Sequence, residues 1–203
     1  MGPLVAHAQW ESMTTPAFSV VIVNWNGQHL LAKCLAALHP TLSDTDQVIV
    51  VDNGSHDDSV AWLHAHAPWV EVIALPQNVG FAGGNNAAFA QCRHDWILLI
   101  NNDAFVDADA LMWLRNCAMH VATDVGAIAA TLVFDHAPEL VASTGIVLRS
   151  DGVALDRDMA LPVHALADAP QAIAGASGGA VLLRRAMLDD IGVFADDFFN
   201  YLE

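Results

Sequence analysis

Four polar segments of this sequence carry side chains able to bind a phosphorylated small molecule. Each follows an apolar run, and they read NWNG at residues 24–27, DNGS at 52–55, NVGFAGGNN at 78–86 and NND at 101–103. A carboxylate such as Asp52 can accept hydrogen bonds from a nucleobase or ribose, and Asp103 can coordinate a divalent cation that neutralises a diphosphate. The glycines of 78–86 would allow a diphosphate to approach the backbone at a helix N-terminus.

Each segment also has a purely structural explanation. Asp52 and residues 101–103 are suited to turns that cap the following helices. Trp25 belongs to a residue type that is more often found in a core than as a stacking platform, and residues 78–86 could form a flexible connector. The last segment also lacks GxGxxG spacing, which argues against a dinucleotide-binding site. Capping alone explains less easily why all four segments follow consecutive strands.

The elements around these segments alternate between strands and helices. Continuous apolar runs predict strands at 18–25, 48–51, 70–75 and 96–100, and helical spacing predicts helices at about 30–38, 56–66 and 84–92. This alternation predicts an α/β, Rossmann-like fold with a mainly parallel central sheet flanked by helices. Ligands bind at the carboxyl ends of strands in such a sheet, where all four polar segments fall.

The second half of the chain has a weaker pattern. We expect a helix from about 107 to 120, a strand at 125–134 and an irregular excursion over 135–176 that contains a β-hairpin around 146–154. Regular pattern returns at 177–184. Residues 1–17 lack the features of a signal peptide and are interpreted as a disordered leader or an expression remnant.

Composition limits the partners of the protein. The chain has 203 residues, 55% of them hydrophobic, and this length suits one domain. Seven basic and 23 acidic residues give a formal charge of 7 − 23 = −16, which repels nucleic acid. Its apolar runs are shorter than the roughly 18 residues of a membrane span. Three well-separated cysteines favour a reducing, cytoplasmic location.

Six segments together resemble family 2 glycosyltransferases of the GT-A fold, in particular the bacterial rhamnosyltransferase-like branch. They are VIVNWNG at 21–27, VVDNGSHDDS at 50–59, NVGFAGGNN at 78–86, LLINNDAFV at 98–106, SGGAVLLRR at 177–185 and GVFADDFFNYLE at 192–203. The resemblance implies a nucleotide-sugar-binding domain over 18–203. Its implied donor contacts are Asn24, Trp25, Asn26, Asp52, Asn53, Gly54, Asn78, Gly80, Phe81, Gly83, Asn85, Asn86, Asn101, Asn102 and Asp103, with Gly178 and Gly179 on the acceptor or sugar side.

The resemblance also implies a reaction. A saccharide or lipid-linked acceptor would attack a nucleotide-diphospho-sugar in one inverting displacement, with rhamnose as the favoured sugar and Mg²⁺ or Mn²⁺ bound at Asp103. The DxD-like element here begins with asparagine, so one carboxylate carries the metal. The family's terminal motif is Glu-Asp, and its aspartate is the general base, which would follow Glu203. We therefore expect 18–203 to end before the base and the acceptor-side helices, with Glu203 as the remaining catalytic candidate.

Two other functions remain open at this point. The chain could be a nucleotide-sugar-binding module without turnover, or a nucleotidyltransferase, a class that also binds phosphate through a divalent cation on a Rossmann-like sheet. Against the second, residues 24–27 are short and uncharged, unlike the basic glycine-rich loop of that class. The resemblance places the intact enzyme in the cytoplasm, with peripheral contact at the inner face of the membrane as an option.

Overall fold

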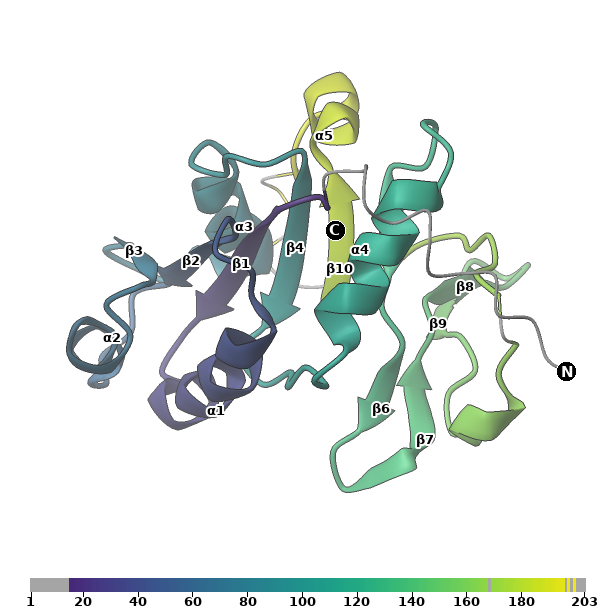
Figure 1. Ribbon diagram of the computed structural model, residues 1–203, viewed down its shortest axis with the longest axis horizontal. Coiled ribbons are helices and arrows are strands. Elements are labelled where there is room, and N and C mark those ends of the chain that lie inside the picture. The colour runs from purple at the N-terminus through teal and green to yellow at the C-terminus, as the bar shows by residue number, and fades with distance from the viewer. Residues whose placement is uncertain (1–14, 168, 196, 198, 200–203) are drawn as a thin grey trace, which may run out of the picture.

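A six-stranded sheet forms the centre of the protein in the computed structural model (Figure 1), which describes residues 15–167, 169–195, 197 and 199. The strand order is β3-β2-β1-β4-β10-β5. These strands are β1 (Phe18–Asn24), β2 (Gln47–Asp52), β3 (Glu71–Ala74), β4 (Trp96–Asn101), β5 (Ala127–Ala129) and β10 (Ala180–Arg184). The first four are mutually parallel, and β10 runs antiparallel to both β4 and β5. The predicted mainly parallel α/β fold is confirmed.

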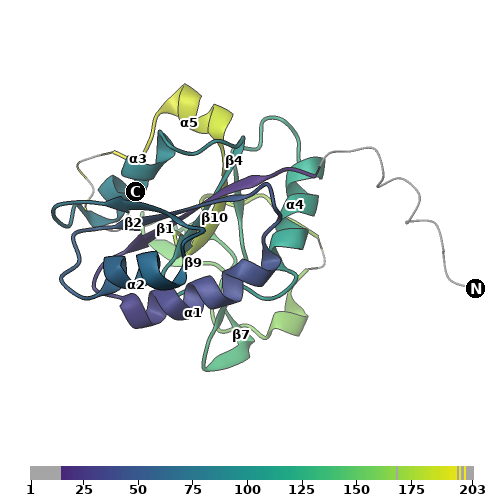
Figure 2. The ribbon, with the colours of Figure 1, turned by 60° about the vertical axis from the view of Figure 1, so that its left-hand side comes forward.

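Helices cover both faces of the sheet because the central strands are apolar on both sides (Figure 2). Val20 and Ile22 of β1 pack into one core with α1 (Gln28–Leu38), α2 (Ser59–His66) and α4 (Ala110–His120). Val21, between them, points into a second core with α3 (Gly80–Phe89) and α5 (Arg185–Ile191). None of the helices in the described part of the chain is long and apolar enough to cross a membrane.

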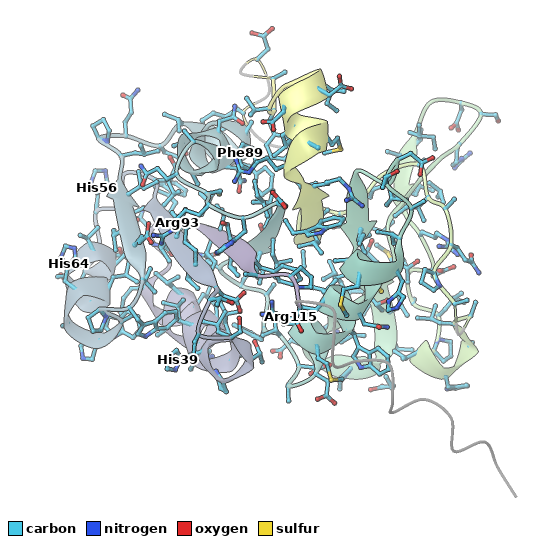
Figure 3. All side chains as sticks on the ribbon, turned by 45° about the horizontal axis from the view of Figure 1, so that its top comes forward. His39, His56, His64, Phe89, Arg93 and Arg115 are labelled. Carbon is cyan, nitrogen blue, oxygen red and sulfur yellow. The ribbon has the colours of Figure 1, made fainter. Side chains whose placement is uncertain are left out.

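A buried ion pair fastens α4 to the start of the sheet. The Arg115 guanidinium binds the carboxylate of Asp46, donates to the carbonyl of Pro16 at 2.6 Å and lies 4.5 Å from the ring centre of Phe18 (Figure 3). Asp46 in turn accepts a hydrogen bond from the backbone N–H of Phe18. This cluster fixes the amino end of β1, opposite the edge that carries the polar segments.

The glycine-rich segment is helical, not a connector. Helix α3 begins at Gly80, whereas the sequence predicted a helix from 84, so residues 80–86 form its first turns. A Cβ at Gly84 would lie 2.7 Å from a methyl carbon of Val23, which shows how closely this helix packs on β1. Gly84 therefore serves close packing of helix against sheet, a role that propensity alone does not reveal.

The second half of the chain departs further from expectation. The single strand predicted at 125–134 is wrong: β5 belongs to the main sheet, and β6 (Leu132–Phe134) pairs with β7 (Ala137–Ser143), a strand that was not predicted. β5 pairs with β10 in the antiparallel direction, so the end of β5 lies opposite the start of β10 at Ala180. The chain therefore leaves the main sheet after Ala129. The predicted hairpin is confirmed as β8 (Ile146–Leu148) with β9 (Ala154–Asp156). Two short 3₁₀ helices, His39–Thr41 and Val163–Ala165, complete the described elements.

Candidate functional site

The carboxyl ends of β1, β2 and β4 bring Asn24, Asp52 and Asn102 together. Asn24 is fully buried, and its amide oxygen accepts a hydrogen bond from Asn102 Nδ2 at 2.8 Å. Its Nδ2 lies 3.4 Å from Asp52 Oδ2 and donates to Ser59 Oγ at 2.9 Å. Three of the four predicted polar segments therefore meet through side-chain hydrogen bonds at one edge of the sheet.

Asp52 and Trp25 differ sharply in exposure. Asp52 is 2% exposed, and its Oδ1 accepts the backbone N–H of Ser55 at 3.0 Å. This contact closes the turn after β2, as the capping explanation requires, although α2 itself begins four residues later, at Ser59. Trp25 is 54% exposed, so it is not a core residue, and its ring is open to a stacking partner.

Asn26 connects the first two polar segments. Its backbone N–H donates to Ser55 Oγ at 2.9 Å, and its side-chain oxygen accepts the N–H of His56 at 2.7 Å. Asn26 adopts a left-handed backbone with a φ of 50°, a conformation that asparagine tolerates well. The loops after β1 and β2 are thus held together at the edge of the sheet.

A second polar cluster joins the loop after β2 to the start of α3. Asn53 Nδ2 donates to Asn78 Oδ1 at 3.1 Å and to the carbonyl of Gly80 at 2.9 Å. The backbone N–H groups of Val79 and Gly80 donate to Asn53 Oδ1 and Asn78 Oδ1. Gly54, with a φ of +74°, has no room for a Cβ beside the backbone of Gln77. Asn53 and Asn78 therefore fix the start of α3.

The chain after α5 also reaches the start of α3. The Phe81 N–H donates to the carbonyl of Phe199 at 2.7 Å, and Asn86 exchanges two hydrogen bonds with the backbone of Phe194. Asn85, which is buried, donates to the carbonyl of Phe81 at 2.9 Å. The N–H groups of Gly80 and Phe81 thus have protein acceptors, and a diphosphate at this helix end stays a prediction. Gly83 lies against Val79 of the same segment.

Gly178 and Gly179 lie between the two clusters. The carbonyl of Gly179 accepts the N–H of Asn101 at 3.0 Å, and a Cβ at Gly178 would lie 3.1 Å from the ring of Phe81. The predicted sugar-side glycines are therefore next to both the end of β4 and the start of α3. Glu203, the catalytic candidate, lies outside the described residues.

The end of β4 offers oxygen ligands for a metal. Asp103 is exposed, and because Asn102 Nδ2 is committed to Asn24, the Oδ1 of Asn102 remains as an acceptor. One carboxylate and one amide oxygen fit a hard cation that also takes oxygens from a diphosphate and water. Among the described residues no group of three or more His, Cys, Asp or Glu side chains could hold a metal by itself.

Cys34 lies beneath this turn and is not a ligand. Its Sγ is 3.7 Å from the carbonyl oxygen of Asn101. Burial, followed by the negative charge of Asp103, raises the pKa of the Cys34 thiol to about 12. Hard cations such as Mg²⁺ and Mn²⁺ prefer oxygen ligands, so this buried sulfur does not compete with the oxygens of Asn102 and Asp103.

Sequence reasoning missed four residues that organise the site. Asp57 precedes α2 and Ser59 is its first residue, within the segment 50–59 that carries the family resemblance, but neither was among the predicted site residues. Phe194 and Phe199 lie in the aromatic and acidic stretch that follows α5, and no local signal pairs them with residues 81 and 86. A cavity of about 790 Å³ between α4, β5 and residues 157–173 contains none of the predicted site residues.

The sheet order and the helices on both faces are those of the GT-A fold. A mannosyltransferase from Pyrobaculum calidifontis, solved with GDP-Man and Mn²⁺, superposes with a TM-score of 0.63 at 17% identity over 91% of this chain and 49% of its own. S. aureus TarS in complex with UDP gives a TM-score of 0.61 at 17% identity over 90% of this chain and 51% of its own.

Sequence comparison gives the family. The model described as "Glycosyl transferase family 2" matches residues 19–134, and the chain belongs to this family. An N-acetylglucosaminyltransferase of Rhizobium meliloti is 30% identical over 57% of this chain, and a chondroitin synthase of Escherichia coli is 31% identical over 47% of it. The matched regions are 28% and 14% of those two proteins, and about half of the solved structures.

Proposed function

We propose that this chain is the donor-binding part of an inverting, metal-dependent glycosyltransferase that uses a nucleotide-diphospho-sugar. The observation that carries the proposal is the meeting of Asn24, Asp52 and Asn102 at one end of the sheet, where the next residues after Asn24 and Asn102 are the exposed Trp25 and Asp103. A nucleobase can stack on an aromatic face, the base or ribose can donate to a carboxylate, and a cation held on anionic oxygen can neutralise a diphosphate. Asp52, Trp25 and Asp103 offer these groups at the ends of the neighbouring strands β2, β1 and β4. Family membership argues against the nucleotidyltransferase alternative.

Each residue has a distinct part in the proposed binding. Trp25 stacks on the nucleobase, and Asp52 accepts hydrogen bonds from the base or ribose. Asp103, with Asn102 Oδ1, would hold Mg²⁺ or Mn²⁺, which when bound neutralises charge on the leaving diphosphate. Gly178 and Gly179, which pack against Phe81 and Leu132, are assigned to the sugar side of the site.

The reaction itself is a single displacement. An acceptor hydroxyl attacks the anomeric carbon, the bond from that carbon to the diphosphate breaks on the opposite face, and the configuration inverts. A carboxylate must take the hydroxyl proton. The resemblance to the rhamnosyltransferase-like branch favours dTDP-rhamnose as donor and a saccharide or lipid-linked acceptor, in the cytoplasm or at the inner face of the membrane.

Calorimetric titration tests the proposal directly. We expect UDP, GDP or dTDP to bind more tightly with Mn²⁺ than with EDTA, and the nucleoside without phosphate to show no response to the metal. The preferred nucleotide identifies the donor, with dTDP expected. If none of the three nucleotides binds the folded chain under either condition, the proposed function is wrong. Transfer of labelled sugar then separates an enzyme from a binding module without turnover.

A further inference from the structure

We propose that Asn24 is a positioning residue of this site: it fixes the orientation of the Asn102 side chain beside Asp103 without touching the donor. The inference deepens the proposed function and rests on it. Asn24 is 0% exposed, so no atom of its side chain is open to a bound nucleotide. Its side chain nevertheless contacts the ends of two neighbouring elements, through Asn102 after β4 and Ser59 at the start of α2.

The directions of the hydrogen bonds follow from Asp57. Its carboxylate is acceptor-only when ionised, and it accepts the hydroxyl of Ser59 together with the N–H groups of Ser59 and Gln28. Ser59 Oγ, having given its proton to Asp57, is left as an acceptor for Asn24 Nδ2 at 2.9 Å. The amide of Asn24 is therefore oriented with Nδ2 toward α2 and Oδ1 toward Asn102.

This orientation propagates to Asn102. Because Asn24 presents an oxygen, Asn102 must present Nδ2 to it, at 2.8 Å, and its own Oδ1 must point away. That oxygen is the atom we assign to the metal, next to the Asp103 carboxylate. A freely rotating Asn102 would present NH₂ in half of its amide orientations, and NH₂ cannot coordinate a cation. Residues 101–103 contain a single carboxylate, so the second oxygen ligand of the metal depends on the orientation that Asn24 gives to the Asn102 amide.

The backbone at Gly27 lies so close to the hydrogen bond between Asn24 and Asn102 that a side chain at this position would displace it. A Cβ at Gly27 would lie 2.4 Å from Asn102 Nδ2 and 2.8 Å from Asn24 Oδ1. Gly27 has a φ of −122°, an ordinary conformation for any residue, so alanine there would introduce no backbone strain. Gly27→Ala therefore separates Asn24 from Asn102 while leaving both side chains in the protein.

The test compares variants that break this contact with one that damages β1 at its other end. Asn24→Ala deletes the oxygen that accepts the hydrogen bond from Asn102. Gly27→Ala places a methyl group against both side chains. Ser19→Ala is the matched control, since Ser19 is equally buried on the same strand and its hydroxyl bonds Gln47 at the opposite sheet edge. Affinity for dTDP, UDP and GDP is measured with Mn²⁺ and with EDTA.

We expect Asn24→Ala and Gly27→Ala to reduce the Mn²⁺-dependent gain in affinity about 3–10-fold, as one lost neutral hydrogen bond predicts. Asn102→Ala should do the same, and Asn24→Ala should add nothing in the Asn102→Ala background. Ser19→Ala should lower the melting temperature but keep the gain. Independent, additive losses, or an equal loss in Ser19→Ala, would overturn the inference.

Hydrogen exchange of the Asn102 side chain tests the contact with Asn24 in the absence of any ligand. The side-chain NH₂ of Asn102 should exchange slowly with solvent in the parent and quickly in Asn24→Ala and Gly27→Ala. If the parent shows no gain from Mn²⁺, the proposed function and the inference fall together, even where the NH₂ is protected. If the parent shows the gain and both variants retain it, the inference alone is overturned.

Discussion

The backbone N–H of Phe81 donates to the carbonyl of Phe199 at 2.7 Å, so the chain after α5 caps the start of α3. Phe194, in the same stretch, lies 5.9 Å from the Phe81 ring and 5.7 Å from the Phe89 ring, measured between ring centres. Gly80 accommodates the approach, because a Cβ there would lie 2.1 Å from the Phe199 oxygen. A helix end that faces the proposed donor site thus depends on residues more than 100 positions away.

Phe194→Ala should loosen this cap and destabilise the fold by about 1–3 kcal/mol, since it removes a partly buried ring and its two aromatic contacts. Urea unfolding measures the loss, and amide exchange at Phe81 reports on the cap. Val193→Ala, at an exposed neighbouring position, is the control and should change neither quantity. An unchanged Phe81 exchange rate in Phe194→Ala would show that the cap does not depend on aromatic packing.

The Asp46–Arg115 pair should make folding sensitive to acid. Partial burial raises the pKa of Asp46, but hydrogen bonds from Arg115, Phe18 and Ser43 and the Arg115 charge together hold it below the ordinary value of 3.8. A carboxyl with a depressed folded pKa stabilises the fold above its unfolded pKa and loses that contribution as pH falls through the folded pKa.

We expect Asp46→Asn to cost about 3–5 kcal/mol at pH 7, because it leaves the buried Arg115 charge unpaired. The difference from the parent should shrink as pH falls below about 4. Chemical unfolding between pH 7 and pH 3 measures this. Asp44→Asn, which removes the same charge from an exposed position two residues earlier, should be nearly neutral. A difference that stays constant across this range would contradict the role given to the Asp46 charge.

The parallel part of the sheet was predictable because its strands are continuous β-branched runs, as in Val20 to Ile22, that suit burial on both faces. The start of α3 was not predictable, because glycine has poor helix propensity and its use there is explained by tertiary packing, of Gly84 against Val23 and of Gly80 against Phe199. The strand predicted at 125–134 failed for a similar reason. Local pattern cannot show that residues 127–129 pair with β10 at the edge of the main sheet while residues 132–134 pair with β7.

The positions of the candidate site residues were readable from sequence, but their contacts were not. Asn24 ends β1, Asp52 ends β2 and Asn102 directly follows β4, which places all three at the same end of the sheet. That Asn24 would be wholly buried depends on partners 28 to 78 residues away, Asp52, Ser59 and Asn102. Sequence spacing carries no information on contacts of this range.

Asp103→Ala should abolish the Mn²⁺-dependent gain in nucleoside-diphosphate affinity, a loss of about 1–3 kcal/mol for a charge-assisted contact. Asp107→Ala removes an exposed carboxylate four residues later and should keep the gain. Calorimetric titration with Mn²⁺ and with EDTA measures both. Equal metal-dependent binding by Asp103→Ala and the parent would remove Asp103 from the site.

Trp25→Ala should weaken binding of every nucleotide that the parent binds, by about 1–3 kcal/mol, because base stacking is tolerant of sequence. The ring is 54% exposed, so its removal should leave the unfolding free energy nearly unchanged. Trp113 on α4, 61% exposed, provides the matched control. Similar losses in Trp25→Ala and Trp113→Ala would point to a general effect of removing surface tryptophan.

Asp52→Asn should discriminate between recognition of the base and capping of the turn. The substitution keeps the shape of the side chain and an oxygen for the N–H of Ser55, which lies 3.0 Å from Oδ1, but it replaces the other carboxylate oxygen with a donor. If that oxygen accepts a hydrogen bond from the base or ribose, affinity should fall for all nucleotides that share the recognised edge. The substitution also loses the long 3.4 Å contact from Asn24 Nδ2, so the melting temperature should fall slightly while circular dichroism changes little. Asp52→Ala should lose affinity to the same extent and also lose the turn contact, at a cost in stability of about 1 kcal/mol. Reading the two variants together decides the role: binding that survives in Asp52→Asn and fails only where the fold weakens in Asp52→Ala would show that Asp52 holds the turn and not the nucleotide.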